Sequence, residues 1–177
     1  ASFRLVLVLL LIARATLYGQ SAEQWFQRGD SLELAGNSAA AITAYTKALT
    51  IQPRFVSALA NRAISKQSVG DLQGARADYD AAIAIDPSMA LLYANRGTVL
   101  AEMQQSKAAL ADFDEALRRN PHDADTWANK GLIYYRDGDY RQSVQSYTQA
   151  LRELPQSSLF YSLRAQSKDA ASDKEIG

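Results

Sequence analysis

The sequence contains no cysteine and a single histidine, His122, and these two facts exclude several kinds of site. Without cysteine the chain can form no disulfide, no thiolate metal site and no cysteine nucleophile. His122 directly follows a proline in an expected loop, where we expect it to be solvated. The sequence also has no glycine-rich phosphate loop and no histidine-rich metal spacing. It therefore predicts no catalytic residues, no metal site and no cofactor.

The chain also lacks an excess of charge of either sign. It carries 19 basic and 19 acidic residues, and its pI is about 6.8. A net charge near zero gives no general attraction to nucleic acid or to anionic membranes. We therefore expect no nucleic-acid partner, and we expect local charges to decide specificity.

Proline is scarce but regularly placed. The prolines follow one another at a constant interval of 34 residues, at Pro53, Pro87, Pro121 and Pro155. The same interval aligns a column of large residues, Trp25, Leu59, Tyr93 and Trp127, and a column of small ones, Gly29, Ala63, Gly97 and Gly131. It also aligns a second ring column, Tyr45, Tyr79, Phe113 and Tyr147, and a second small column, Ala48, Ala82, Ala116 and Ala150. Each interval therefore predicts two amphipathic helices joined by a turn.

A helix-turn-helix period of this length, with alternating large and small columns, resembles the tetratricopeptide repeat family. The resemblance implies an all-α fold: a right-handed α-α superhelix (solenoid) of about four helix-turn-helix repeats plus a C-terminal capping helix. We expect repeats over 22–55, 56–89, 90–123 and 124–157, a capping helix over 158–168 and a flexible tail over 169–177. In the capping helix, Tyr161 is expected in the column of Trp127 and Ala165 in that of Gly131. We expect Gly97 to let the second and third repeats approach each other.

Two residues depart from the repeat pattern. At the turn of the third repeat, Gln104 stands where the other repeats have glycine, and we expect only a modest penalty for it. In the second repeat Lys66 stands in an otherwise apolar column. We expect its stem to lie on apolar surface and its ammonium group to reach water.

The first 21 residues lie outside the repeats. After Arg4 comes an unbroken apolar run, Leu5–Ala13, followed by Arg14 and then by small and polar residues. This order resembles a secretory signal peptide, with cleavage after Gly19 or Ser21 and a periplasmic or secreted product. The alternatives are an uncleaved membrane anchor, which would be the chain's one contact with a membrane, and a packed N-terminal helix. A lipid anchor on cysteine is excluded.

A column of side-chain amides is the main candidate site. Gln27, Asn61, Asn95 and Asn129 recur at the repeat interval, two residues after the large column and therefore facing away from the partner helix. In the family resembled, the first helices line a concave surface where such asparagines bind the backbone of an extended peptide. Both the donor and the acceptor of an amide match a peptide unit. The same face adds Ile64, Thr98, Leu132 and Arg136. The alternative is that these amides are solvated or bond across neighbouring repeats.

Charged columns run beside the amides. We expect the basic column, Arg28, Arg62, Arg96 and Lys130, to pair with acids of a neighbouring second helix. The acid pairs Asp78 with Asp80 and Asp112 with Asp114 are two residues apart, about 200° around a helix. They cannot share a metal ion or a proton on one face, and salt bridges between repeats are expected instead.

The sequence thus predicts a non-enzymatic protein–protein interaction module, an adaptor or scaffold that binds an extended peptide or a partner helix in its concave groove. The partner is a protein or peptide whose identity the sequence does not give. One alternative is a structural or self-associating repeat module. Another is an accessory fragment of a larger protein whose catalytic part is missing.

Overall fold

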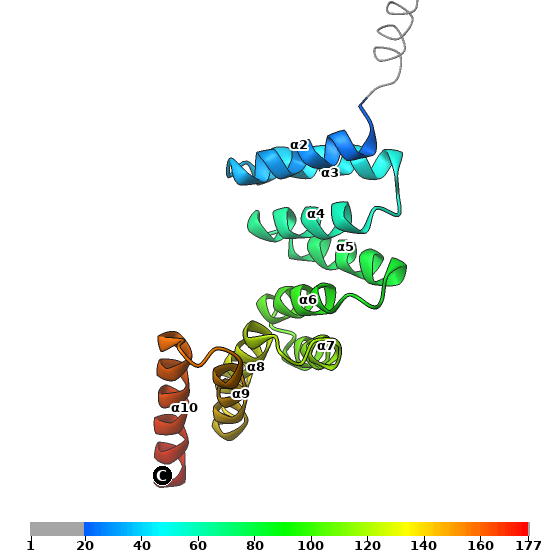
Figure 1. Cartoon of the computed structure of the whole chain (residues 1–177). Helices are drawn as coiled ribbons and strands as arrows, with labels where there is room; N and C mark the ends of the chain where they lie inside the picture. The colour runs from blue at the N-terminus through cyan, green and yellow to red at the C-terminus, as the bar shows by residue number, and fades with distance from the viewer. Residues whose placement is uncertain (1–19, 177) are drawn as a thin grey trace, which may run out of the picture.

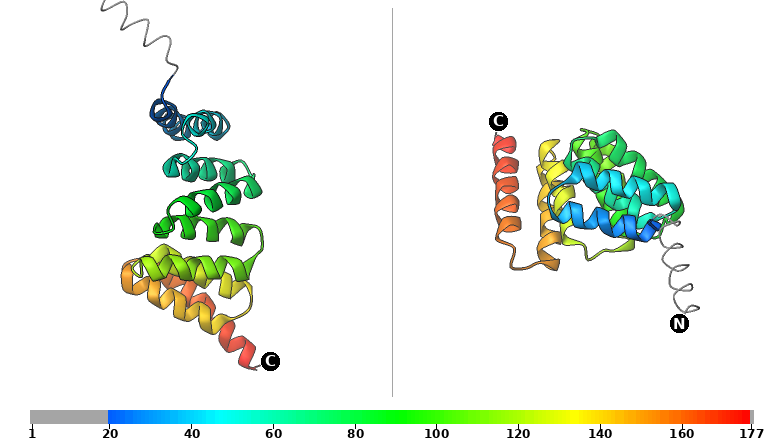
Figure 2. Two further views of the ribbon diagram at one scale, coloured as in Figure 1. Left: turned by 90° about the vertical axis from the view of Figure 1, so that its right-hand side faces the viewer. Right: turned by 90° about the horizontal axis from the view of Figure 1, so that it is seen from above.

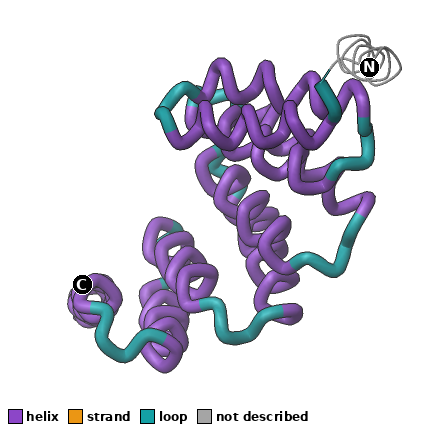
Figure 3. Tube along the Cα trace, turned by 45° about the horizontal axis from the view of Figure 1, so that its top comes forward, coloured by secondary structure: helices purple, strands orange, loops and turns teal. Residues whose placement is uncertain are grey.

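The computed structural model describes residues 20–176, and over these residues the chain consists of helices and loops without a strand (Figure 3). The helices are α2 (Ala22–Leu34), α3 (Ser38–Ile51), α4 (Val56–Ser68), α5 (Leu72–Ile85), α6 (Ala90–Glu102), α7 (Ser106–Arg119), α8 (Ala124–Arg136), α9 (Tyr140–Glu153) and α10 (Ser158–Ile176). They stack in chain order, and α2 and α10 lie at opposite ends of the stack (Figure 1). The expected all-α helical repeat solenoid is confirmed.

Every helix packs mainly against its neighbours in the chain, α2 against α3, α3 against α4 and so on to α10. The first helices of adjacent pairs also touch, α2 with α4 and α6 with α8. Within residues 20–176 the main contacts therefore lie within helix pairs and between adjacent pairs, as expected for a quasi-one-dimensional repeat protein.

The prolines end the second helix of each pair. The residue before each proline has left the helical region, for example Gln52 with φ −129° and ψ 87° and Asp86 with φ −135° and ψ 90°. Asn120 and Leu154 behave in the same way. A proline ring clashes with a helical conformation of the residue before it, so the chain must extend there. The regular spacing of the prolines therefore sets the regular spacing of the helix pairs.

The turn inside each pair needs one residue in the left-handed region. Gly36, Gly70 and Gly138 supply it with φ between 73° and 82°, and Gln104 supplies it in the third pair with φ 59°. As predicted, glutamine is accommodated at this position, where a side chain is strained but tolerated. Asn37, Asp71 and Asp139 then cap the following helices by accepting a hydrogen bond from a backbone N–H.

The core of each pair is a ring lying on a small residue. Tyr45, Phe113 and Tyr147 are buried, and each lies against the glycine of its own first helix. A Cβ atom on Gly97 would fall 2.6 Å from Cε1 of Phe113. Because Phe113 belongs to the same pair as Gly97, the close approach is within the third repeat. The expectation that Gly97 lets the second and third repeats approach each other was wrong, since that column faces the partner helix of its own repeat.

Lys66 also differs from expectation. Its ammonium group does not extend into water but lies 2.9 Å from Oδ2 of Asp78 and 3.4 Å from the carbonyl oxygen of Gly74. Asp78 is buried and already binds Arg62. An ion pair between Lys66 and this buried carboxylate is more favourable than an ammonium group that remains in water.

The C-terminal helix is longer than expected, and two of its aligned residues are exposed. α10 runs over 19 residues to Ile176 and does not end at Lys168, because 169–176 contains neither proline nor glycine. Phe160 is buried against α9, whereas Tyr161 and Ala165 are exposed. Phe160 has the register of Leu92 and Thr126, which face the preceding second helix, and no described second helix follows α10 to cover Tyr161. Figure 2 shows α10 beside α9.

The expected signal peptide or anchor over residues 1–21 lies almost wholly outside the described residues. Of that segment only Gln20 and Ser21 are described, and Ser21 caps α2 by accepting a hydrogen bond from Gln24 N. Within residues 20–176, no helix combines the length and the apolar character that crossing a membrane requires.

The tyrosine hydroxyls of the first two pairs have different surroundings. The Tyr45 hydroxyl donates to Oδ1 of Asp30 at 2.7 Å. In the second pair the residue equivalent to Asp30 is Ile64, and the buried Tyr79 hydroxyl has no hydrogen-bond partner. Burial raises the pKa of Tyr79 to about 12, against a smaller lowering by the nearby Asn95 amide, and the phenol is neutral at neutral pH.

We predict that Gly97→Leu destabilises the protein by several kcal/mol, because overpacking a filled core costs about 1 to 3 kcal/mol and this side chain meets a ring directly. Chemical denaturation would measure the change in the free energy of unfolding. Gly131→Ala is the matched comparison, with Tyr147 atoms 3.0 Å from the added Cβ, and should have a smaller effect. Equal stabilities of Gly97→Leu and the parent would contradict the packing.

We predict opposite effects for two hydroxyl deletions. Tyr45→Phe removes a donor from Asp30 and should lower the free energy of unfolding by about 1 to 2 kcal/mol. Tyr79→Phe removes an unsatisfied buried group and should leave stability unchanged or raise it by up to about 1 kcal/mol. Thermal or urea unfolding of the two variants in parallel checks the sign of the difference, and a larger loss for Tyr79→Phe would show that its hydroxyl is satisfied.

Candidate functional site

The first helix of each pair carries a stripe of residues spaced by four, three and four positions, a spacing that places them on one face of a helix. This first-helix stripe consists of Glu23, Gln27, Asp30 and Leu34 in α2, Ser57, Asn61, Ile64 and Ser68 in α4, Leu91, Asn95, Thr98 and Glu102 in α6, and Asp125, Asn129, Leu132 and Arg136 in α8. All eight predicted site residues belong to it.

Large apolar side chains are exposed along this stripe. Leu34 is 91% exposed, Leu91 59%, Leu132 45% and Ile64 41%. They lie on four successive pairs, one on each, and alternate with amides and charged groups. Isolated exposed leucines are ordinary, but a row of them beside polar groups is typical of an interaction surface.

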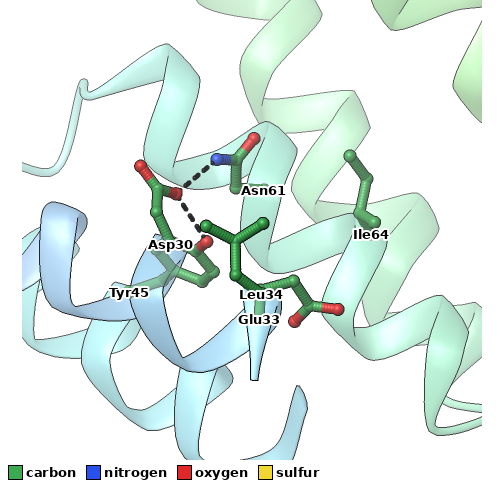
Figure 4. Close-up of a pocket in the computed structure, with 6 residues that line it drawn as sticks. All are labelled: Asp30, Glu33, Leu34, Tyr45, Asn61 and Ile64. Carbon is green, nitrogen blue, oxygen red and sulfur yellow. Dashed lines mark hydrogen bonds between the residues drawn. The ribbon is translucent and has the colours of Figure 1, made fainter. Parts of the chain in front are cut away.

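A hollow of about 350 Å³ lies at the α2 end of the stripe. It is lined by Asp30, Glu33, Leu34, Tyr45, Asn61 and Ile64, from α2, α3 and α4 (Figure 4). Asp30 Oδ1 accepts hydrogen bonds from the Tyr45 hydroxyl at 2.7 Å and from Asn61 Nδ2 at 2.8 Å. These bonds join the first two repeats and fix one wall of the hollow. Burial, followed by the hydrogen bond to Asp30, raises the pKa of Tyr45 well above its usual value.

The second carboxylate of the hollow is also bound only by neutral groups. Glu33 accepts hydrogen bonds from the hydroxyls of Ser38 and Ser65. Among the described residues no lysine, arginine or histidine forms an ion pair with Asp30 or Glu33. The hollow therefore contains two acidic groups and no basic one.

The structure places the predicted amides in different surroundings. Asn61 lies in the hollow with Ile64 and bonds across the first two repeats, which is the alternative use expected for this column. Gln27 is exposed, and its amide donates to Glu23 at 3.4 Å. Asn95 and Asn129 are half-buried. Asn95 lies near the Tyr79 hydroxyl and lowers its pKa, against the larger effect of burial.

The other predicted residues lie further along the stripe. The Thr98 hydroxyl donates to the carbonyl of Ala94 in its own helix, so it is partly occupied. Leu132 and Arg136 are exposed in α8. The hollow lined by Asn61 and Ile64 includes none of these three residues, which lie on the third and fourth helix pairs. Their role in a shared groove stays a prediction.

Sequence reasoning missed two lining residues. Glu33 is adjacent to Leu34 and lies off the stripe by its spacing, so only its contact with Ser65 of the next repeat brings it into the hollow. Tyr45 was assigned to the core by its column, which is correct for its ring but not for its hydroxyl. The sequence did contain an indication that the Tyr45 hydroxyl has a polar partner. Asp30 stands where the other repeats have Ile64, Thr98 and Leu132.

Three members of the basic column, Arg62, Arg96 and Lys130, form internal ion pairs as predicted, whereas Arg28 lies over the ring of Trp25. Arg96 binds Asp112 of its own pair through two hydrogen bonds of 2.7 Å and Asp80 of the preceding pair through one of 2.6 Å. Arg62 binds Asp78 and the Thr46 hydroxyl in the same way.

The two acids of each pair therefore serve different repeats. Asp78 binds Arg62 of its own repeat and Asp80 binds Arg96 of the next. Lys130 binds Asp114 of the preceding pair. These cations hold second helices together and are occupied, so they are not the groups that would bind a ligand.

The chain offers little for catalysis or metal binding. His122 is exposed, as expected, and its Nδ1 lies 3.0 Å from Oε2 of Glu153 across a loop. Among the described residues, no group of three or more histidine, aspartate or glutamate side chains is placed to hold a metal ion.

Comparison with known proteins supports the repeat assignment. Two family models, each described as tetratricopeptide repeat, match residues 22–55 and 94–158. No curated protein sequence matches the chain. The crystal structure of MamA protein is similar, with TM-score 0.79 and 20% identity, and the match covers 88% of this chain and 86% of that chain.

Two further solved structures have the same fold. For pilF of Pseudomonas aeruginosa the TM-score is 0.77 at 23% identity, with 86% of this chain and 69% of that chain covered. For YrrB, described as a TPR protein with an unusual peptide-binding site, the TM-score is 0.72 at 17% identity, with coverage of 87% and 79%. At these identities the likeness shows the fold alone. From its family matches, its helix pairs and its fold, the chain belongs to the tetratricopeptide repeat family.

Proposed function

We propose that the chain is a non-enzymatic adaptor that binds an extended peptide, or a partner helix, along the first-helix stripe. The observation that carries the proposal is the row of exposed apolar side chains, Leu34, Ile64, Leu91 and Leu132, that share one helical face with the amides. Repeat proteins of this family generally mediate protein–protein interaction.

The chemistry of the stripe suits a peptide. Amides such as Asn95 and Asn129 supply a donor and an acceptor to a peptide unit whatever its side chain. The exposed leucines supply apolar contacts to alternate side chains of the peptide. Asn61 contributes less than the sequence suggests, because its amide is already bound to Asp30. The peptide-binding site of YrrB, a protein of the same fold, is consistent with this use.

The N-terminal segment supports a second part of the proposal, which concerns where the protein is located. The basic, apolar and small-residue order of residues 1–21 supports an exported module, either released after cleavage or held at a membrane by that segment. Expression of a tagged full-length chain, followed by fractionation and mass determination of its N-terminus, tests this. Recovery of the uncleaved chain in the soluble cytosol would contradict export.

Self-association is the alternative function, and α10 favours it. Leu159 is 61% exposed and Tyr161 48% exposed on that helix. Light scattering over a range of concentrations separates the two functions. A molecular mass that stays at the monomer value supports the adaptor, whereas a mass that rises with concentration and falls after Leu159→Ser supports self-association.

We predict that binding of stripe ligands depends on the amides of Asn95 and Asn129. Peptides selected from a random library by the parent protein should bind Asn95→Ala and Asn129→Ala variants more weakly, each by about 1 kcal/mol, because each substitution removes a hydrogen bond to the peptide. Fluorescence anisotropy of a labelled selected peptide measures the change.

The matched control is Asn120→Ala, an exposed asparagine off the stripe, which should leave the affinity unchanged. Circular dichroism should show the same helix content in every variant. If the variant carrying both Asn95→Ala and Asn129→Ala binds the selected peptides as tightly as the parent, the two amides do not form hydrogen bonds that contribute to peptide binding.

A further inference from the structure

The hollow between α2 and α4 brings two carboxylates together without a cation. The carboxylates at the contacts between first and second helices are paired with cations, Asp78 with Arg62 and Lys66 and Asp112 with Arg96, whereas Asp86 and Asp123 accept hydrogen bonds singly at helix ends. Asp30 and Glu33 have only neutral hydrogen-bond donors, as described above. Two negative charges at the mouth of one hollow are unfavourable unless a cation approaches them.

The hollow also has an apolar wall. Leu34 is almost fully exposed and Ile64 is 41% exposed, and both line the same space as the two carboxylates (Figure 4). Leu34 and Glu33 come from α2, while Ile64 comes from α4. An apolar wall ending in acidic groups complements a side chain that has an aliphatic stem and a positive end.

We propose that this hollow selects a lysine or arginine side chain of the bound peptide. The stem of that side chain lies against Leu34 and Ile64, and its charge faces the carboxylates of Asp30 and Glu33. This inference rests on the proposed function and adds to it a specificity position in the first repeat.

The geometry supports one basic residue at this place and not a generally basic ligand. The volume of about 350 Å³ is that of a small pocket. The bonds from Tyr45 and Asn61 fix Oδ1 of Asp30, and those from Ser38 and Ser65 fix Glu33, so the acids are held in position before a ligand arrives. Fixed charges select more strongly than mobile ones because no ordering is needed on binding.

The test uses the full chain and a positional-scanning library of extended peptides with blocked termini. The parent protein should enrich lysine or arginine at one peptide position. The Asp30→Asn and Glu33→Gln double variant should lose that preference while still retaining peptides, because both substitutions keep a hydrogen-bond acceptor for the surrounding hydroxyls. The matched control removes two acids elsewhere on the stripe, Glu102→Gln with Asp125→Asn, and should keep the preference.

A second measurement uses one enriched peptide and its copy with norleucine in place of the basic residue, which keeps the stem and removes the charge. Norleucine should weaken binding to the parent by about tenfold, as for loss of one charged hydrogen bond, and to the double variant by much less. The Leu34→Ser variant tests the contact with the aliphatic stem separately. It should weaken binding of both peptides by the same factor, because both carry the stem.

The outcomes separate this inference from the proposed function. Peptides retained without a basic preference, or a preference that persists in the Asp30 and Glu33 double variant, overturn the inference and leave the adaptor intact. Retention of no peptide at all overturns both. Equal helix content by circular dichroism in the parent and the variants excludes loss of the fold as the cause of any change.

Discussion

The structure depends on the contact between one ring and one small residue inside each helix pair. Tyr45 lies on Gly29, Phe113 on Gly97 and Tyr147 on Gly131, so closely that a Cβ atom would fall within about 3 Å of the ring. This contact fixes the distance and rotation of the two helices, and the outer face of the first helix is thereby fixed as well. The position of the first-helix stripe follows from a contact on the opposite side of the same helix.

Stacking of the pairs adds a second constraint, which is electrostatic. Arg96 binds one acid of its own pair and one of the preceding pair, and Arg62 and Lys130 act at the equivalent positions. The three cations and the acids Asp78 and Asp112 are largely buried, so their geometry is better defined than that of surface pairs, whereas Asp80 and Asp114 are exposed. At the ends of the array the acids are absent, with Ala44 and Thr46 in the first pair and Ser146 and Thr148 in the fourth. The ion pairs thus concentrate in the middle of the stack.

Most of the fold could be predicted from the sequence because its main signals are local. A proline forces the residue before it out of the helix, and a glycine marks a left-handed turn, whatever the rest of the chain does. The amide column could likewise be placed on one face by spacing alone. The contacts of Lys66 with Asp78 and of Glu33 with Ser65 could not, because they depend on the rotation between helices. The exposure of Tyr161 and Ala165 in α10 was missed for a related reason: among the described residues this terminal helix has one packing partner, and a pattern taken from internal helices does not describe it.

Equivalent positions of the first two repeats carry chemically different residues, Asp30 and Ile64. Since the described first helices pack mainly against elements of their own and adjacent pairs, a substitution on the outer face alters the surface locally. At this position the first pair is acidic and its tyrosine hydroxyl is bonded to the acid, whereas the second pair is apolar and its tyrosine hydroxyl has no such bond. Repeats of this kind can therefore diversify one at a time, and a new binding preference can arise without redesign of the scaffold.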